Sequence, residues 1–277
     1  MSFDLREFAK EKMIVCAHRG LHGANIPQNT LAAFRLALKT GVDMIELDVN
    51  RSVDGKIFIF HHGMERTCFG TDERTRNMSF EQIRALRYLN VDRNPTKHPP
   101  CTLDEVFEEF KNKCFIQIDK FWAYPKEVTD IIRRHRVEDQ VLIKSQADPV
   151  QLKAIEEICP DLAYMVTARS PDDIALASKY DINYTVSEII FENEDSVFTD
   201  PAFIESEHKK GRLFWVHSIV FNDKAVLTAG HNDDTSLTVD PDLGWGWLAD
   251  KGYDIMITDW PMMALDYLKK TGKLYKI

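Results

Sequence analysis

Chemically active side chains are concentrated near the start of the chain. His18 and Arg19 follow one short apolar run, Glu46 and Asp48 lie in a second, and His61 lies at the end of a third. Together these groups could hold a divalent metal ion, bind a phosphate and transfer protons. The set makes hydrolysis of a phosphodiester the leading hypothesis for the chemistry of this chain.

The two carboxylates predict a metal site. Glu46 and Asp48 are two residues apart on an expected strand, so both side chains point to the same face. Two carboxylates facing one point repel each other unless a cation lies between them, and hard oxygen ligands favour Mg²⁺ or Ca²⁺. Asp119, on the next expected strand of the sheet, is the natural third ligand. The alternative is a cluster of salt bridges with nearby basic residues: Arg19, Lys120 or Lys144.

Histidines on either side of these carboxylates predict acid–base chemistry. Imidazole titrates near neutral pH, so one of His18 and His61 could accept a proton while the other donates one. Arg19 offers a planar fork for phosphate oxygens. A single His or Lys at a strand end is more often a structural hydrogen bonder or a solvated side chain. With that alternative open, the further candidates for substrate contact are Lys120, Lys144, Trp215 and His217.

Short apolar runs alternate with amphipathic helical segments along the chain. Strands are expected at residues 13–18, 44–49, 56–61, 115–119, 141–145, 164–167, 184–187, 214–217 and 255–258. Helices are expected at 31–39, 103–110, 126–134, 149–158, 171–178 and 201–210. This alternation indicates a parallel sheet. The length of 277 residues suits one (β/α)8 barrel, which typically needs about 250.

One of the nine expected strands has to lie outside an eight-stranded barrel. The connection at 51–56 is too short for a right-handed crossover, and Asp54-Gly55 is a strong hairpin signal. The strand at 56–61 should therefore fold back antiparallel and return His61 to the level of Glu46. We expect an α/β fold, namely a TIM (β/α)8 barrel that spans 1–277 as a single domain. It should carry an antiparallel hairpin and a small insertion after the second barrel strand.

Two excursions from the barrel are expected, at about 50–100 and 219–243. The first contains several Gly and Pro residues and one short helix near 80–86, which suggests a cover above the barrel mouth. The second is polar and lacks strong periodicity, so we interpret it as a lid or rim loop. Within it, Asp233-Asp234 is interpreted as a solvated pair, and Trp245 and Trp247 as packing against the hinge.

The barrel would bring the active side chains together. The C-terminal ends of barrel strands converge on one pocket. Charged groups are dense at these expected ends, whereas the strand middles consist of Ile, Val, Met and Phe. This asymmetry is the best sign of an enzyme that the residues alone provide.

Composition limits the partners. The formal net charge of −9 argues against general nucleic-acid binding but does not exclude a small anionic substrate. No run reaches 18 apolar residues and the start has no apolar signal core, so we expect no membrane span and a cytoplasmic location. The five cysteines show no C-x-x-C spacing, which makes a zinc site or a disulfide framework unexpected. Cys16 and Cys114 read as small core residues.

The motifs together resemble the glycerophosphodiester phosphodiesterase family. The resemblance rests on segments spread along the chain: AHRG at 17–20, PQNT at 27–30, ELDV at 46–49, DG at 54–55, the strand ending at His61, TLDEV at 102–106, PDL at 160–162 and ITDWP at 257–261. It implies a TIM-like barrel, a divalent metal ion and a small-molecule substrate. The implied reaction is hydrolysis of sn-glycero-3-phosphodiesters to glycerol 3-phosphate and an alcohol.

The resemblance also implies roles for single residues. His18 and His61 would be the catalytic histidines, and Arg19 would bind phosphate. The implied metal ligands are three carboxylates: Glu46, Asp48 and Asp119, the last standing where the family usually has a glutamate.

The chain departs from the family pattern at several positions near the expected mouth. Gln28 replaces a usual Glu, and His62 stands where the family usually has Asp. In Asp119-Lys120-Phe121 the lysine is one position earlier than in the usual Glu-x-Lys, and Arg66-Thr67 lies one residue closer to His61. These departures suggest weaker metal binding, a shifted substrate or a drift from the usual reaction.

Two alternatives to this hypothesis therefore stay open. One is a phospholipase-D-like or phosphoinositide-cleaving enzyme on the same barrel, which should show an exposed apolar or aromatic rim. Another is a non-catalytic phosphodiester-binding homologue, for which Gln28 and His62 are the evidence. Within the leading hypothesis, the nucleophile could be water or a neighbouring hydroxyl of the substrate.

Overall fold

Eight parallel strands close into a barrel at the centre of the molecule. In the computed structural model, which describes residues 3–276, the strand order is β1-β9-β8-β7-β6-β5-β4-β2, and β1 pairs with β2 to close the ring. The barrel strands are β1 (Ile14–Ala17), β2 (Met44–Arg51), β4 (Phe115–Asp119), β5 (Val141–Gln146), β6 (Tyr164–Ala168), β7 (Tyr184–Ile189), β8 (Leu213–His217) and β9 (Ile255–Thr258). The expected TIM barrel is confirmed.

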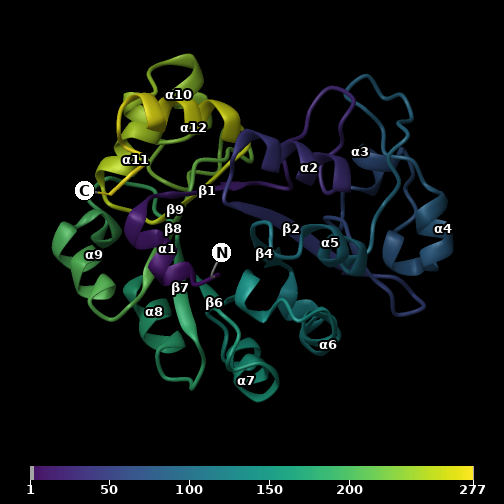
Figure 1. Cartoon of the computed structure of the whole chain (residues 1–277), viewed down its shortest axis with the longest axis horizontal. Coiled ribbons are helices and arrows are strands. Elements are labelled where there is room, and N and C mark those ends of the chain that lie inside the picture. Colours follow the sequence, from purple (N-terminus) through teal and green to yellow (C-terminus); the bar gives the residue numbers. More distant parts are fainter. Residues whose placement is uncertain (1–2, 277) are drawn as a thin grey trace.

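Helices surround this barrel (Figure 1). They are α2 (Leu31–Thr40), α5 (Leu103–Phe110), α6 (Pro125–His135), α7 (Pro149–Ile158), α8 (Pro171–Ala177), α9 (Pro201–His208) and α12 (Pro261–Lys270). Local caps start several of them, because the first backbone N–H groups of a helix need acceptors. The Thr30 hydroxyl accepts from Ala33 N–H at 3.2 Å, and Thr102 with Glu105 forms a capping box on α5.

The short helix α1 (Leu5–Glu11) closes the N-terminal end of the barrel. The sequence did not lead us to expect it. Phe8 packs on Phe115, the first residue of β4, with ring centroids 5.5 Å apart. Apolar side chains of α1 therefore pack against the first residues of the barrel strands at this end.

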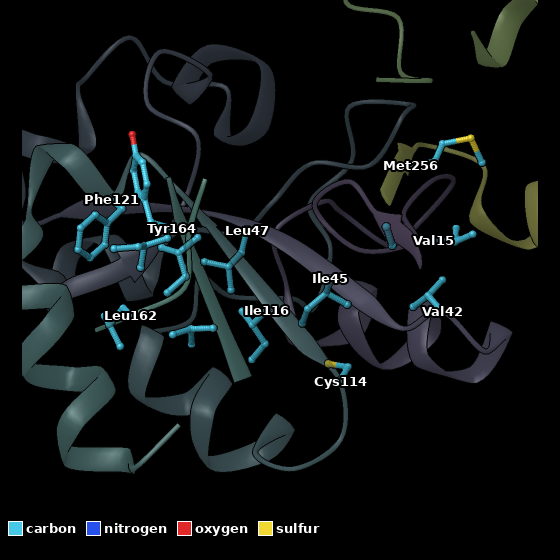
Figure 2. Packing of buried hydrophobic residues seen from close by; sticks show 14 of the residues in the cluster. Val15, Val42, Ile45, Leu47, Cys114, Ile116, Phe121, Leu162, Tyr164 and Met256 are labelled. Atoms are coloured by element: carbon cyan, nitrogen blue, oxygen red, sulfur yellow. The ribbon is translucent and has the colours of Figure 1, made fainter. Parts of the chain in front are cut away.

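The core has two layers, since side chains alternate along each strand. Residues that point into the barrel include Ile14, Cys16, Met44 and Met165. Their neighbours point outward and pack against the helices. Figure 2 shows part of this outer layer, which includes Ile45, Leu47, Ile116 and Cys114. All five cysteines are buried thiols, as expected for Cys16 and Cys114.

The segment after β2 turns back on that strand. Strand β3 (Ile57–Ile59) pairs antiparallel with β2, with Val49 opposite Ile59. The chain then forms α3 (Glu65–Phe69), a 3-10 turn η1 (Thr75–Asn77) and α4 (Phe80–Ala85), seen at the right of Figure 1. This segment has its own small apolar cluster, which includes Phe58, Phe60, Met78, Ile83 and Tyr88.

The segment after β8 is more ordered than the expected rim loop. It contains α10 (Asp233–Thr238), a π-helical turn η5 (Asp242–Gly246) and α11 (Trp247–Asp250). None of the helices that residues 3–276 form combines the length and the apolar character that crossing a bilayer requires.

The interpretation of Asp233 as a solvated residue is wrong. Its side chain is 2% exposed. Oδ1 accepts hydrogen bonds from the Ser218 and Thr258 hydroxyls at 2.7 Å and from Trp245 Nε1–H at 2.8 Å, and Oδ2 accepts from Asp259 N–H at 2.9 Å. Asp233 thus joins the second excursion to the end of β9. Loop composition does not show which of two adjacent aspartates turns inward.

Replacing Asp233 with alanine is expected to destabilise the fold by roughly 3–5 kcal/mol, because four buried donors lose their acceptor. Urea denaturation measures the free energy of unfolding. The matched control is Asp234→Ala, since Asp234 is the exposed neighbour on the same helix. An equal, small effect of both substitutions would contradict the anchoring role.

Candidate active site

The side chains singled out from the sequence surround one cavity at the C-terminal end of the barrel. Its volume is about 390 Å³. The predicted residues on its wall are His18, Arg19, Glu46, His61, Asp119, Lys120, Lys144, Trp215 and His217. Asp48 is fully buried beside Glu46 and Asp119. The structure therefore brings all ten predicted site residues together, although they come from or directly follow six different strands.

Three carboxylates form a cluster that suits a divalent cation. Ligand oxygens of Glu46, Asp48 and Asp119 lie within 4.8 Å of one another. Asp48 Oδ1 is buried and has no hydrogen-bond partner among the described residues, whereas Asp48 Oδ2 accepts from Asn29 Nδ2 at 2.9 Å. An unpartnered buried carboxylate oxygen is costly unless a cation neutralises it. The donor set is all oxygen, which fits Mg²⁺ or Ca²⁺.

Electrostatics within this cluster differ from one carboxyl to the next. Burial and the neighbouring Asp48 and Asp119 raise the pKa of Glu46 well above its usual value. Burial alone would also raise the pKa of Asp119, but the ammonium groups of Lys144 and Lys120 lower it below its usual value. The charged form of Glu46 is therefore disfavoured in the absence of a cation, and a bound cation would stabilise it.

A tight turn after β1 aims Arg19 at the carboxylates. Arg19 and Gly20 both have positive φ, 54° and 79°. A Cβ at Gly20 would lie 2.7 Å from the backbone carbon of Ala33, so only glycine allows α2 to approach this turn. As a result Arg19 N–H donates to Glu46 Oε2 at 2.8 Å, and Arg19 Nε lies 3.0 Å from Asp48 Oδ2.

The segment 27–30 supports these groups from behind. Gln28 Oε1 accepts from Arg19 Nη1 at 2.7 Å. Asn29 is buried, donates to Asp48 Oδ2 and accepts from Asp48 N–H at 3.3 Å. Sequence reasoning used this segment only as part of a resemblance and missed the role of Asn29. The signal available was a polar residue directly before a helix cap.

His18 is oriented by a carboxylate from the far end of the chain. His18 Nδ1 lies 2.7 Å from Asp259 Oδ1, and His22 Nε2 lies 3.7 Å from the same oxygen. Burial lowers the pKa of His18, while the hydrogen bond and charge of Asp259 oppose this shift. Burial would raise the pKa of Asp259, but the two imidazoles hold it well below its usual range. In the sequence analysis Asp259 was part of the motif at 257–261 but received no role of its own.

Asp259 contacts His18 and does not line the cavity, so we expect it to act by positioning His18. Asp259→Asn is expected to lower kcat by about 10²-fold, within the range that a well-placed acid–base group contributes. Loss of the carboxylate also removes a charge that raises the pKa of His18, so the His18 limb of the pH–rate profile should move to lower pH. The profile of kcat/KM from pH 4 to 9 measures this shift.

A matched control exists outside the cavity. His208 Nε2 lies 2.8 Å from Asp254 Oδ2 in a second His–Asp pair. Asp254→Asn should leave the limb in place. An unmoved limb in Asp259→Asn would show that Asp259 does not act on His18.

His61 is held by its own backbone. Its Nδ1 lies 2.9 Å from the carbonyl oxygen of His62. A carbonyl can only accept, so Nδ1 carries the proton and Nε2 is the free nitrogen of the neutral ring. Nε2 faces Asp48 Oδ1 at 4.0 Å. Burial lowers the pKa of His61, although Asp48 opposes the shift.

A buried ion pair lies on the other wall of the cavity. Lys144 Nζ lies 2.8 Å from Glu188 Oε1 and 3.6 Å from Asp119 Oδ1. His217 Nε2 lies 3.1 Å from the same Glu188 oxygen. Burial would raise the pKa of Glu188, but Lys144 and His217 hold it well below its usual range. Glu188 is the penultimate residue of β7, and it received no role in the sequence analysis. The pair fixes a positive charge near the carboxylate cluster.

Comparison with known proteins places the chain in a family of phosphodiesterases. Residues 18–262 match the model of the glycerophosphoryl diester phosphodiesterase family. The chain belongs to this family, which confirms the resemblance found in its motifs.

Individual relatives of known sequence carry the name of the same family. A glycerophosphodiester phosphodiesterase of Caldanaerobacter subterraneus subsp. tengcongensis is 31% identical over 54% of this chain and 65% of its own length. One from Bacillus altitudinis is 28% identical over 47% of this chain and 57% of its own length. The chain thus spans less than two thirds of these relatives.

Solved structures share the fold. A glycerophosphoryl diester phosphodiesterase from Parabacteroides distasonis has a TM-score of 0.80 at 16% identity, covering 98% of this chain and 95% of the other. A phosphodiesterase from Oleispira antarctica, solved with the product sn-glycerol-3-phosphate, has a TM-score of 0.69 at 18% identity and covers 96% and 99%.

Proposed function

We propose that this protein hydrolyses glycerophosphodiesters to glycerol 3-phosphate and an alcohol, with a divalent metal ion and two histidines. The observation that carries this proposal is the cavity lined by Glu46, Asp119, Arg19 and both imidazoles, with Asp48 buried beside the two carboxylates. Relatives named as glycerophosphodiester phosphodiesterases support the reaction. The product in the Oleispira antarctica structure is the one expected here.

The carboxylate cluster and the basic groups bind the phosphodiester. Mg²⁺ or Ca²⁺ held by Glu46, Asp48 and Asp119 would neutralise phosphate charge and stabilise the transition state. The Arg19 guanidinium is held by Gln28 and faces the same cavity, so it can bind phosphate oxygens.

The remaining cavity wall suits the rest of the substrate. Two lysines line it and add positive charge on the side of Asp119: Lys120 and Lys144. Trp215 Nε1 and His217 Nδ1 are buried and have no hydrogen-bond partner among the described residues, whereas His217 Nε2 lies 3.1 Å from Glu188 Oε1. These groups are placed to contact the glycerol part of the substrate.

The histidines move the protons. One imidazole accepts a proton from the nucleophile, and the other donates a proton to the oxygen of the leaving alcohol. His18 is paired with Asp259, which stabilises the charged ring once it gains a proton, whereas His61 has a free Nε2 beside the carboxylates. Water or a neighbouring hydroxyl of the substrate serves as nucleophile.

The barrel and its two excursions form one working unit in this proposal. Residues 1–277 are one domain, in which the segments at about 50–100 and 219–243 shape the mouth of the site. The described part of the first segment delivers His61, and the second brings Phe221 over the cavity, 6.4 Å from His18 between ring centroids.

A lipid-directed activity has less support. It should show an aromatic rim, but Trp245 is 2% exposed and Trp247 stacks on His231. Phe221, at 56%, and Trp260, at 48%, are exposed, which is a small aromatic surface for a lipid. The alternative of a non-catalytic binding protein rests on Gln28 and His62, and the position of Gln28 beside Arg19 is compatible with turnover.

The deciding experiment is incubation with glycerophosphocholine, glycerophosphoethanolamine and glycerophosphoinositol, with and without a chelator. Release of glycerol 3-phosphate, measured with a coupled dehydrogenase, should require added Mg²⁺ or Ca²⁺. Binding of these diesters without product would support the non-catalytic alternative. Turnover that persists in the chelator would contradict the metal-dependent reaction.

A further inference from the structure

A second cavity lies next to the candidate active site. Its volume is about 540 Å³. The polar and aromatic side chains on its wall include Asn50, His62, Arg74, Arg76, Lys120 and Trp122. Lys120 lines both this cavity and the candidate active site. The two spaces are therefore adjacent, and Lys120 belongs to the wall of both.

Neighbouring residues on β2 and after β3 connect the two cavities. Asp48 and Asn50 are two residues apart on β2, so they project to the same side of the strand. After β3, His61 lines the first cavity and His62 lines the second. Their rings are stacked, with centroids 5.4 Å apart. A diester with its phosphate at the carboxylate cluster thus has room for one arm in each cavity.

The second cavity carries an excess of positive charge. Three permanent cations line it, namely Arg74, Arg76 and Lys120, against one carboxylate, Glu65. Lys120 Nζ also lies 3.1 Å from Asp119 Oδ2 of the candidate active site. Glu65 Oε2 is paired with Arg74 Nη1 at 3.1 Å, and Glu65 Oε1 accepts hydrogen bonds from the Thr75 N–H and hydroxyl. Arg76 makes no ion pair and no side-chain hydrogen bond within residues 3–276. In a chain with a net charge of −9, such a wall favours an anionic ligand.

Lys120 and Trp122 form one side of this cavity. Lys120 has a positive φ of 62°, and its Nζ lies over the Trp122 ring at 5.2 Å from the centroid. The aromatic ring next to the cations offers a surface for the carbon skeleton of a ligand.

We propose that the second cavity binds the leaving alcohol of the diester and that this alcohol carries a further negative charge, as a phosphate or carboxylate group. The inference rests on the proposed function and narrows its substrate class. Arg76 is the specificity residue, because its guanidinium has no other partner in the described structure. The hydrolysis itself is unchanged.

The first test compares headgroups of different charge. The substrates are glycerophosphocholine, glycerophosphoinositol and glycerophosphoinositol 4-phosphate, with cationic, neutral and anionic headgroups. We expect kcat/KM to rise in that order. Arg76→Ala should lower the anionic-to-cationic ratio of kcat/KM roughly tenfold, the effect of losing one charge-assisted contact at an exposed site.

The control variant is Arg169→Ala. Arg169 is exposed and follows β6 at the same end of the barrel, but it lines neither cavity. The Arg169→Ala substitution also removes one positive charge, and it should leave the anionic-to-cationic ratio of kcat/KM unchanged. A wild-type preference for the cationic headgroup, or an unchanged ratio in Arg76→Ala, would overturn the inference while leaving the proposed function intact.

A binding measurement decides the case without turnover. Calorimetry should show that inositol 4-phosphate binds the wild type and binds Arg76→Ala about tenfold more weakly, while inositol does not bind. The affinity for inorganic phosphate should depend less on Arg76, since inorganic phosphate can bind at Arg19. Absence of inositol 4-phosphate binding, or an equal loss for inorganic phosphate, would overturn the assignment of the cavity to the leaving alcohol. Failure of all diesters to react would count against the proposed function alone.

Discussion

Alanine at His18 or at His61 is expected to lower kcat by roughly 10²–10⁴-fold in each case, because each imidazole would transfer one proton of the reaction. KM should change less, since neither ring is the main anchor of the phosphate in our proposal. Initial rates of glycerol 3-phosphate release at saturating metal measure both parameters. Melting temperatures of the variants show whether the fold has survived.

The double variant adds a sharper criterion. If the two histidines act as one unit, His18→Ala combined with His61→Ala should be little slower than the slower single variant. His98→Ala is the control, since His98 lies in the insertion and lines neither cavity. Wild-type turnover in both single variants would disprove the assignment of the acid–base pair.

Removing one carboxylate of the cluster is expected to abolish metal binding and with it the activity. Glu46→Gln keeps the shape of the side chain and its acceptor for Arg19 N–H but removes one of the three clustered charges. At a metal concentration of 100 Kd the wild type should gain about 2.7 kcal/mol of stability. The variant should gain almost none. Calorimetry with Mg²⁺ and Ca²⁺, and thermal melts with and without chelator, provide the readouts.

In the absence of metal, Glu46→Gln is expected to stabilise the fold. Burial and the neighbouring carboxylates disfavour the charged form of Glu46, which is the reason for its raised pKa. The cost of charging appears only as the pH rises above the ordinary pKa of a glutamate, so it is present at neutral pH. Metal-free Glu46→Gln should therefore melt at a higher temperature than the metal-free wild type.

Asp72→Asn serves as the control for this prediction. Asp72 is a highly exposed carboxylate, paired only loosely with Arg66 at 3.6 Å. Its loss should change neither the metal affinity nor the stability gained from metal. A Glu46→Gln variant that binds metal as tightly as the wild type would exclude this carboxylate as a ligand.

The sequence was sufficient for the barrel and for the centre of the site. Apolar runs at regular intervals marked the strands, because a parallel strand covered on both faces has to be apolar. The two-residue spacing of Glu46 and Asp48 set their common direction, since strand side chains alternate. The Asp54-Gly55 signal predicted the reversal that the structure shows between β2 and β3.

Only the tertiary structure showed which groups act on those residues. Asp259 meets His18 across 241 positions of the chain, and Glu188 meets Lys144 across 44. Asp233 is buried although it lies in a polar segment. No local pattern encodes such pairs, because the partners approach each other only when the barrel closes. Likewise, the second cavity exists because the insertion folds against β2 and the end of β4, which places Arg76 near Lys120. Residue type and spacing thus determined the available chemistry, and barrel closure determined the partners that hold and charge each group.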